Sequence, residues 1–448
     1  MQLPGRISAA IEILDEFQSR RIPLKTVISD WSRRSRFAGA KDRAWISGLC
    51  LDTLRRRSEI AHLMGAETGR SLIIGTLAQV WQMEASEITA ALADEDHGAG
   101  AASLEEEESL ARLAVGDHLA APECLGRPEP PVPISGNYPE WLDIEIARVF
   151  CEKRASAMAH FAERADVDLR INSLKATEEK TMAALKSVKA EPSDILTGAV
   201  RIPAPPPTVR ETPITVIPAF NKGWVEVQDL GSQIAAAAAG KVHGKQVLDF
   251  CAGGGGKTLA LAAAMENKGQ LYAYDIDARR LKPIYARAKR AGVRNLQVIN
   301  PITDKDGLAA LKGSMDLVFV DAPCTGSGTW RRHPDAKWRL TEKQLAKRRE
   351  EQQTVLSEAR TFVKPGGRLI YVTCSFLPSE NEDQVHWFLD THPEWKLIDT
   401  IEAITASGQL TEQGSTALAS CKIDNGMLRL TPDKVRADAF FVACLAID

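Results

Sequence analysis

Short apolar runs alternate with helical segments from Gln233 onward, and this alternation limits the possible folds more than any other feature of the chain. Strand-like runs cover residues 246–251, 270–274, 296–299, 316–320 and 368–373, and helical patterns cover 233–239, 258–265, 281–290 and 342–363. Alternation at these lengths predicts a parallel, doubly wound α/β sheet. A last apolar run at 439–445 predicts an edge or antiparallel strand.

The residues before Gln233 predict two further domains. Residues 3 to about 93 carry apolar side chains at helical spacing, which is typical of a small helical bundle. A proline cluster at 127–133 marks a boundary. Beyond it, helices are expected from Tyr138 and over 154–164 and 177–188, and short strands over 168–172, 199–202, 214–217 and 224–228. Because 448 residues exceed what one core usually serves, we expect a helical domain (1–130), a small α+β module (131–232) and the doubly wound domain (233–448).

Basic residues gather in two stretches although the net charge is only −3. The first stretch contains Arg20, Arg21, Lys25, Arg33, Arg34, Arg36, Lys41, Arg43, Arg55, Arg56 and Arg57, and the second contains Arg331, Arg332, His333, Lys337, Arg339, Lys343, Lys347, Arg348 and Arg349. Two separate basic patches indicate a polyanionic partner. Solvated helix surfaces explain the first stretch equally well.

The cysteine pattern and the hydropathy exclude several classes of protein. The eight cysteines include no CxxC pair, so we expect neither a metal site nor a disulfide framework. The chain has no apolar run of about 18 residues and no secretory signal, so we expect a cytoplasmic protein that does not enter a membrane.

Four glycines, Gly253 to Gly256, stand between the first predicted strand of the doubly wound domain and its helix. Glycines let a ligand approach the backbone, and a helix N-terminus favours an anionic group. The sequence Gly256-Lys257-Thr258 resembles the end of a P-loop, but Cys251 stands where that motif requires glycine. The GxGxxG spacing of dinucleotide-binding loops is not met either.

Two carboxylates narrow the choice of cofactor. Asp275 ends the second strand, where a carboxylate can bind ribose hydroxyls, although a helix N-cap is the simpler interpretation. Asp321 ends a later strand. Together with the glycine loop, they describe a site for a nucleoside cofactor without phosphate-binding spacing. S-adenosylmethionine fits that description.

Cys324 and Cys374 each follow a strand and precede a loop of small polar residues. Other cysteines, such as Cys50, Cys151 and Cys444, are expected to be small hydrophobic residues. A reactive thiol needs a positive field, which Lys257, Arg331 or Arg332 could supply. Two such thiols suit methylation of a pyrimidine at C5: one thiolate adds to C6, and a second group helps the product leave. Asp321 could stabilise the charge that develops on the ring. The spacing does not decide which cysteine attacks.

These motifs resemble those of the Sun-type (Fmu) RNA cytosine-5 methyltransferases, in particular the bacterial RsmB-like enzymes. The resemblance covers residues 138–446 and rests on LRINSLK (169–175), WVEVQD (224–229), LDFCAGGGGKT (248–258), DAPCTGSGTWRRHPDAKW (321–338), YVTCSFLPSENE (371–382) and DAFFVA (438–443). It implies a Rossmann-like domain, Cys374 as the nucleophile and Cys324 as the residue that assists product release. It also implies that the cofactor contacts are Cys251, Ala252, Gly253, Gly254, Gly255, Gly256, Lys257, Asp275 and Asp321.

The chain departs from the family pattern at three positions. Gly254 replaces the proline of CAxPGGKT, which gives a loop with more conformational entropy to lose. Asn300 stands near the position of the usual adenine-contacting aspartate and is assigned as its substitute. Ala439 replaces the glycine of DGFF.

The N-terminal helices, with the cluster Arg33 to Arg36, resemble the NusB-like RNA-binding domain of the bacterial enzymes. The resemblance therefore implies a monomeric methyltransferase that uses S-adenosylmethionine and acts on 16S ribosomal RNA. The catalytic motifs are equally compatible with a transfer-RNA methyltransferase. A non-catalytic RNA-binding assembly factor is the alternative from another class, although binding alone would need neither thiol.

Overall fold

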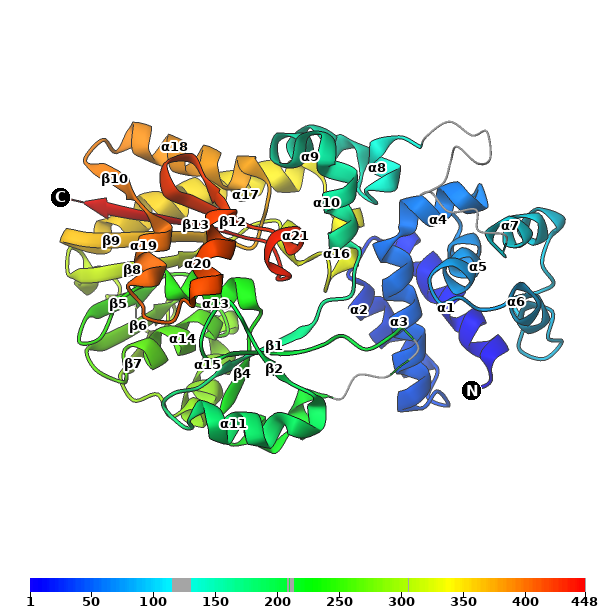
Figure 1. The fold of residues 1–448 in the computed structure, drawn as a ribbon, viewed down its shortest axis with the longest axis horizontal. Coiled ribbons are helices and arrows are strands. Elements are labelled where there is room, and N and C mark those ends of the chain that lie inside the picture. The colour runs from blue at the N-terminus through cyan, green and yellow to red at the C-terminus, as the bar shows by residue number, and fades with distance from the viewer. Residues whose placement is uncertain (115–129, 208, 210–212, 305, 448) are drawn as a thin grey trace. The chain divides into compact units, whose positions relative to one another are not determined.

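A computed structural model describes residues 1–114, 130–207, 209, 213–304 and 306–447 of the protein. The chain forms two compact units, of which the first contains Met1–Arg164, Pro205–Glu211 and Trp330–Leu340 and the second contains the rest (Figure 1). The expected boundary loop at 127–133 lies partly outside the described residues, at 127–129. No helix in the described part of the chain combines the length and the hydropathy needed to cross a membrane.

The first unit is helical, as the apolar spacing of its sequence predicts. Its helices are α1 (Leu3–Arg20), α2 (Leu24–Arg34), α3 (Ala40–Arg55), α4 (Arg57–Met64), α5 (Gly69–Gln79), α6 (Ala85–Leu92), α7 (Leu104–Ala114), α8 (Val132–Ser135), α9 (Asp143–Phe150) and α10 (Arg154–Phe161), with 3-10 turns η2 (Glu140–Leu142) and η3 (Cys151–Lys153). Apolar side chains on α1 to α6, such as Ile13, Leu49 and Ile74, are fully buried in its core. Burial of such side chains is the main force that holds a helical bundle together.

Trp330–Leu340, with helix α16 (Pro334–Arg339), belongs to this first unit and not to the sheet domain that surrounds it in sequence. The Trp338 indole donates to the carbonyl of Leu54 at 2.6 Å, and the backbone N–H of Leu24 donates to Asp335 at 3.2 Å. Arg331 and Lys337 are 3% and 1% exposed. The second basic stretch of the sequence is therefore not one solvent-exposed patch, because two of its cations are buried in this segment.

The predicted α+β module (131–232) is divided between the units: residues 131–164, with α8 to α10, belong to the first unit, and the part that follows, apart from Pro205–Glu211, belongs to the second. Its sheet has the strand order β2-β3-β1-β4, with β1 (Val167–Ile171), β2 (Glu191–Pro192), β3 (Ala199–Ile202) and β4 (Val225–Val227). Helix α11 (Glu178–Leu185), the turn η4 (Lys186–Val188) and helix α12 (Pro218–Asn221) accompany it. Residues 214–217 were expected to be a strand, but Ile214–Val216 form the 3-10 turn η5. Pro213 and Pro218 flank this segment, and neither can donate to a strand ladder.

The larger sheet has nine strands in the described residues, in the order β11-β12-β13-β9-β8-β5-β6-β7, with β10 also paired to β13. The parallel part contains β5 (Gln246–Asp249), β6 (Gln270–Tyr274), β7 (Leu296–Ile299), β8 (Met315–Asp321) and β9 (Val363–Thr373). The antiparallel part contains β10 (Trp395–Ile398), β11 (Lys422–Ile423), β12 (Met427–Leu430) and β13 (Phe440–Ile447). The Rossmann-like α/β prediction is thus confirmed, and the last strand is antiparallel but interior, because it pairs with β9 on one side and with β12 and β10 on the other.

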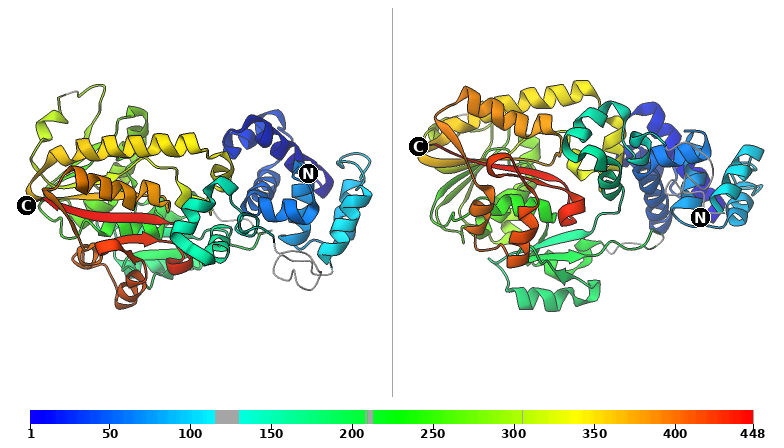
Figure 2. Two further views of the ribbon diagram at one scale, coloured as in Figure 1. Left: turned by 90° about the horizontal axis from the view of Figure 1, so that it is seen from above. Right: turned by 45° about the horizontal axis from the view of Figure 1, so that its top comes forward.

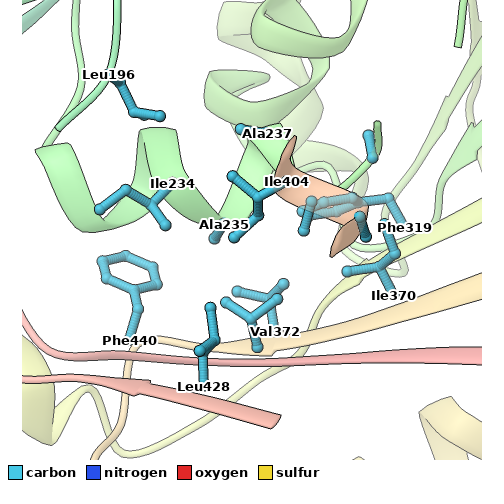
Figure 3. Close-up of a cluster of buried hydrophobic side chains, with 14 of the residues drawn as sticks. Leu196, Ile234, Ala235, Ala237, Phe319, Ile370, Val372, Ile404, Leu428 and Phe440 are labelled. Carbon is cyan, nitrogen blue, oxygen red and sulfur yellow. The ribbon is translucent and has the colours of Figure 1, made fainter. Parts of the chain in front are cut away.

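Helices cover both faces of this sheet (Figure 2). The helices α13 (Leu230–Ala237), α14 (Gly256–Ala264), α15 (Ala278–Ala291) and α19 (Thr400–Thr405) lie on one face, and α17 (Glu342–Ala359) and α18 (Glu382–Thr391) on the other. Ile234 and Ala235 of α13 belong to the same buried cluster as Phe319, Ile370 and Val372 of the strands (Figure 3). The remaining elements are α20 (Glu412–Ala419), α21 (Pro432–Val435) and the turns η6 (Ala309–Leu311), η7 (Ser327–Thr329), η8 (Arg360–Phe362), η9 (Pro378–Glu380) and η10 (Asp424–Gly426).

Candidate active site

The two cysteine loops meet because β8 and β9 are parallel neighbours. Asp321, the last residue of β8, pairs with Val372, one residue before the end of β9. Cys324 and Cys374 therefore follow two adjacent strands at the carboxyl edge of the sheet, where ligands of such sheets bind. The backbone N–H of Gly328 donates to the carbonyl of Cys374 at 3.0 Å and ties the two loops together.

The sulfur atoms of Cys324 and Cys374 lie 3.4 Å apart, and both cysteines are free. The hydrogen bond with Cys374, together with burial, raises the pKa of Cys324 well above its ordinary value. A thiol that shares a hydrogen bond with a second thiol stabilises ionisation of its partner when it remains protonated itself. Cys324 is therefore the thiol that keeps its proton.

Lys257 is the cation that the structure brings to this pair. Its ammonium group donates to Asp321 at 2.7 Å and lies 5.0 Å from the centre of the Phe440 ring. Burial alone would lower the pKa of Lys257, but Asp321 and the Cys374 sulfur raise it overall. Lys257 is thus a fixed positive charge whose field acts on Cys374.

Arg331, which was predicted as another source of positive charge, instead binds groups of the first unit. Its guanidinium donates to the carbonyl of Arg164 at 3.3 Å, and its own carbonyl accepts from Arg55 at 2.8 Å. These partners all belong to the first unit, as does Arg332. Of the cations predicted to supply a positive field, Lys257 is therefore the one that the structure brings to the thiols.

The glycine loop has the conformation that its composition permits. Gly253 and Gly255 have positive φ angles of 50° and 85°. A Cβ atom on Gly255 would lie 2.5 Å from Ile284, so glycine is required there for space as well as for conformation. The loop ends at Gly256, the first residue of α14, whose first-turn N–H groups have no partner within the helix.

Asp275 anchors this loop and does not cap the next helix. Its carboxylate accepts from the N–H of Gly253 at 3.0 Å and from the N–H of Asp277 at 2.9 Å, and it pairs with Arg280 at 3.1 Å. The N-cap of α15 is Asp277, so the simpler interpretation of Asp275 was wrong.

Asn300 follows β7 at the same edge of the sheet, where its side-chain oxygen accepts from the N–H of Ile302 at 2.9 Å. The structure thus places Cys251 to Lys257, Asp275, Asn300, Asp321, Cys324 and Cys374 at the carboxyl ends of β5, β6, β7, β8 and β9. Their shared edge is the location that the sequence predicts.

Sequence reasoning missed the residue that holds the Cys324 loop. Glu380 is fully buried and accepts from both the N–H and the hydroxyl of Thr325, at 2.7 and 2.6 Å. Gln352 bridges this carboxylate to the carbonyl of Pro323, at 3.3 and 2.9 Å. The signal in the sequence was the run Ser379-Glu380-Asn381-Glu382, which places polar residues directly after the second cysteine loop.

The Cys374 loop has its own support. The hydroxyls of Ser327 and Ser375 lie 2.8 Å apart, and Asn381 accepts from Thr373 at 2.6 Å and donates to the carbonyl of Ser375 at 3.0 Å. A Cβ atom on Gly328 would lie 2.0 Å from the carbonyl oxygen of Ala439. Substitution of Gly328 would therefore separate the elements that place the thiols.

Asp249, at the end of β5, is a second residue that the sequence did not single out. It is fully buried, accepts from the Thr258 hydroxyl at 2.6 Å, and its other oxygen has no hydrogen-bond partner among the described residues. Burial raises its pKa to about 7. A buried carboxylate oxygen without a partner is costly unless a ligand satisfies it.

Comparison with known proteins agrees with this architecture. Residues 238–446 match the family model for the 16S rRNA methyltransferase RsmB/F. A probable ribosomal RNA small subunit methyltransferase B from Synechocystis is 30% identical over 311 residues, which cover 69% of this chain and 66% of that protein. The chain thus spans just under two thirds of this relative.

Solved structures share the fold. The crystal structure of PH0851 aligns with 99% of both chains at a TM-score of 0.70 and 23% identity. A methyltransferase homologue from Pyrococcus horikoshii aligns with 71% of this chain and 98% of its own at a TM-score of 0.56 and 24% identity. Over residues 238–446 this chain is thus similar in sequence to the RsmB/F methyltransferases, and it shares the fold of the two solved structures.

Proposed function

We propose that the protein transfers a methyl group from S-adenosylmethionine to C5 of a cytosine in RNA, and that the RNA is 16S ribosomal RNA. The observation that carries the proposal is the pair of thiols 3.4 Å apart beside the Lys257–Asp321 ion pair. The names of the matched family and of the relative from Synechocystis support ribosomal RNA of the small subunit as the substrate.

The residues of the carboxyl edge fit the proposed cofactor. The first turn of α14 offers N–H groups to the carboxylate of the methionine part, and the free oxygen of Asp249 offers an acceptor. Asp275 and Asn300 stand at the ends of the next two strands, where a nucleoside would lie. When bound, the cofactor supplies an electrophilic methyl group.

Cys374 is the proposed nucleophile. An attacking sulfur needs a positive charge nearby, and the Lys257 ammonium and the Cys324 thiol are polar groups beside the Cys374 sulfur. The thiolate forms a bond to C6 of cytosine, the C5–C6 double bond is lost, and its electron pair makes C5 able to accept the methyl group. Asp321, held by Lys257, would bind the N3–N4 edge of the ring and stabilise its charge.

Release reverses the addition. A base removes the proton from C5, the C5–C6 double bond re-forms, and the bond from Cys374 to C6 breaks. Cys324 lies within hydrogen-bond distance of the leaving sulfur and is assigned to this stage. Its raised pKa suits a group that holds its proton until the adduct has formed.

The helical first unit is proposed to bind RNA. Side chains of Arg33, Arg36 and Lys41, at the end of α2 and the start of α3, are exposed. In contrast, Arg55 is buried and pairs with Asp52 at 2.8 Å. The exposed cations can contact phosphates, which fix the position of an RNA without reading its sequence.

Methyl transfer from labelled S-adenosylmethionine to unmodified RNA tests the proposal. Wild-type protein should label 16S ribosomal RNA, and bisulfite sequencing should map the label to one or a few 5-methylcytosines. Label on transfer RNA alone would show a different substrate. No label on either RNA, from protein that binds the cofactor, would refute the enzymatic function and favour an assembly factor.

A further inference from the structure

Gly254 is a residue of the glycine loop at which the local backbone gives no reason for glycine. Unlike Gly253 and Gly255, it does not have a positive φ angle. A Cβ atom on Gly254 would meet Arg287 at 3.6 Å, an ordinary contact distance. Neither conformation nor space therefore requires glycine at this position.

The neighbours of Gly254 are held through their N–H groups. Ala252 donates to the carbonyl of Tyr274 at 2.9 Å, Gly253 donates to Asp275 at 3.0 Å, and Gly255 donates to the carbonyl of Ala252 at 2.9 Å. The N–H of Gly254 has no partner among the described residues. Its carbonyl accepts from Arg287 of α15 at 2.8 Å.

Arg287 is itself held in place by the small α+β module. Glu226 of β4, 2% exposed, pairs with Arg287 at 3.3 Å and with Arg290 at 2.6 Å. The guanidinium of Arg290 also lies 4.1 Å from the centre of the Phe220 ring. A chain of contacts therefore runs from the module, through Arg287, to the carbonyl of Gly254.

We propose that Arg287 is a positioning residue that, oriented by Glu226, holds the Gly254 carbonyl and so orders the loop before the cofactor binds. Glycine at 254 leaves the free loop with more backbone conformations to lose than proline would. The charge-assisted hydrogen bond from Arg287 stabilises the ordered loop and so offsets the entropy that the loop loses. The inference rests on the proposed use of this loop for S-adenosylmethionine.

Binding of S-adenosylhomocysteine, measured by calorimetry, tests the inference without methyl transfer. Arg287→Met should bind about tenfold more weakly than wild type, because a hydrogen bond of a charged group to the loop is lost. Arg279→Ala is the matched control, because Arg279 lies on the same helix, is 84% exposed and pairs only locally with Asp277. The control should bind as wild type does.

A second substitution separates loop ordering from a general structural role. Gly254→Pro in the Arg287→Met background should recover about threefold of the affinity, since proline supplies the order that Arg287 gave. In the free protein, hydrogen exchange across residues 252–258 should speed up in Arg287→Met and slow again in the double variant.

Three results would decide against parts of the account. Unchanged affinity and exchange in Arg287→Met, or weaker binding that Gly254→Pro does not improve, would overturn the role of Arg287. Absence of S-adenosylhomocysteine binding by wild-type protein would instead overturn the proposed cofactor, and the inference would fall with it.

Discussion

Cys324 and Cys374 differ in environment although each follows a strand. Cys324 sits in the loop that Glu380 and Gln352 hold, and its pKa is raised by the hydrogen bond with Cys374 and by burial. The positive charge of Lys257 interacts with Cys374. The raised pKa of Cys324 suits a thiol that acts at release, and the cation beside Cys374 suits a sulfur that attacks.

Asp249→Asn should change how stability depends on pH. The pKa of Asp249 is raised from the ordinary aspartate value of 3.8 to about 7 in the folded protein, so the folded state binds more protons than the unfolded state between these values. Stability therefore falls as pH rises from 4 to 7, by up to about 4 kcal/mol. Asparagine keeps an acceptor for Thr258, so the variant should unfold at a less pH-dependent temperature. Thermal unfolding between pH 5 and 8 checks this, and equal slopes for both proteins would contradict it.

Local sequence patterns could predict only those site residues that lie at the ends of strands. The strand-end residues Asp275, Asp321 and Cys374 follow from apolar runs, because parallel strands all end at one edge. Glu380 and Arg287 could not be found in this way, since each acts on a loop about 30 to 55 residues earlier in the chain. Such partners depend on tertiary packing, which no local pattern contains.

At the scale of elements, hydrogen bonds join the two cysteine loops to each other and to the elements that support them. The Cys324 loop is fixed by Glu380 of η9 and Gln352 of α17, and the Cys374 loop by Asn381. Gly328 brings the loops into contact through the carbonyl of Cys374. The reaction would then need little rearrangement of the protein, because the reacting groups are already in position.

Thr325→Val should loosen the Cys324 loop. The substitution removes a 2.6 Å hydrogen bond to the buried carboxylate of Glu380 and should lower the rate of methyl transfer about tenfold, with cofactor affinity unchanged. Thr391→Val is the control, because the Thr391 hydroxyl bonds only to the exposed backbone of its own helix. Single-turnover rates and calorimetry provide the two readouts, and an unaltered rate in Thr325→Val would contradict the role of this contact.

The parallel sheet was predictable because its strands are continuous apolar runs with helices between them. The elements β10, β11 and β12 were not predicted. They are two to four residues long and lie between short helices, so their pairing to β13 leaves little periodic signal. The segment Trp330–Leu340 was also predicted to belong to the sheet domain. Its membership of the helical unit depends on tertiary contacts, such as that of Trp338 with Leu54, which leave no pattern in the sequence.

At the scale of the whole molecule, the chain divides its tasks between two units. The second unit contains the proposed cofactor loop and both thiols, and the first contains the exposed cations proposed to contact RNA. Affinity for RNA and affinity for the cofactor should therefore change independently when residues of one unit are substituted.

Replacement of Arg33, Arg36 and Lys41 by alanine should weaken RNA binding and reduce its salt dependence. The slope of log K against log salt should fall by about two if most of these cations contact phosphates. The control variant replaces Lys241, Lys268 and Lys312, which are exposed and precede β5, β6 and β8. It makes the same change in net charge, but in the second unit and at the edge of the sheet away from the thiols. Filter binding across a salt series should separate the two variants, and equal slopes would argue against the first unit as the RNA-binding surface.

Covalent capture of RNA tests the central proposal, attack by Cys374, most directly. With RNA and S-adenosylmethionine, Cys324→Ala should accumulate a protein–RNA adduct on a denaturing gel, because attack proceeds but release is slowed. The double variant Cys324→Ala/Cys374→Ala should form none. An adduct that persists in the double variant, or methyl transfer at the wild-type rate by Cys374→Ala, would contradict the assignment of the nucleophile.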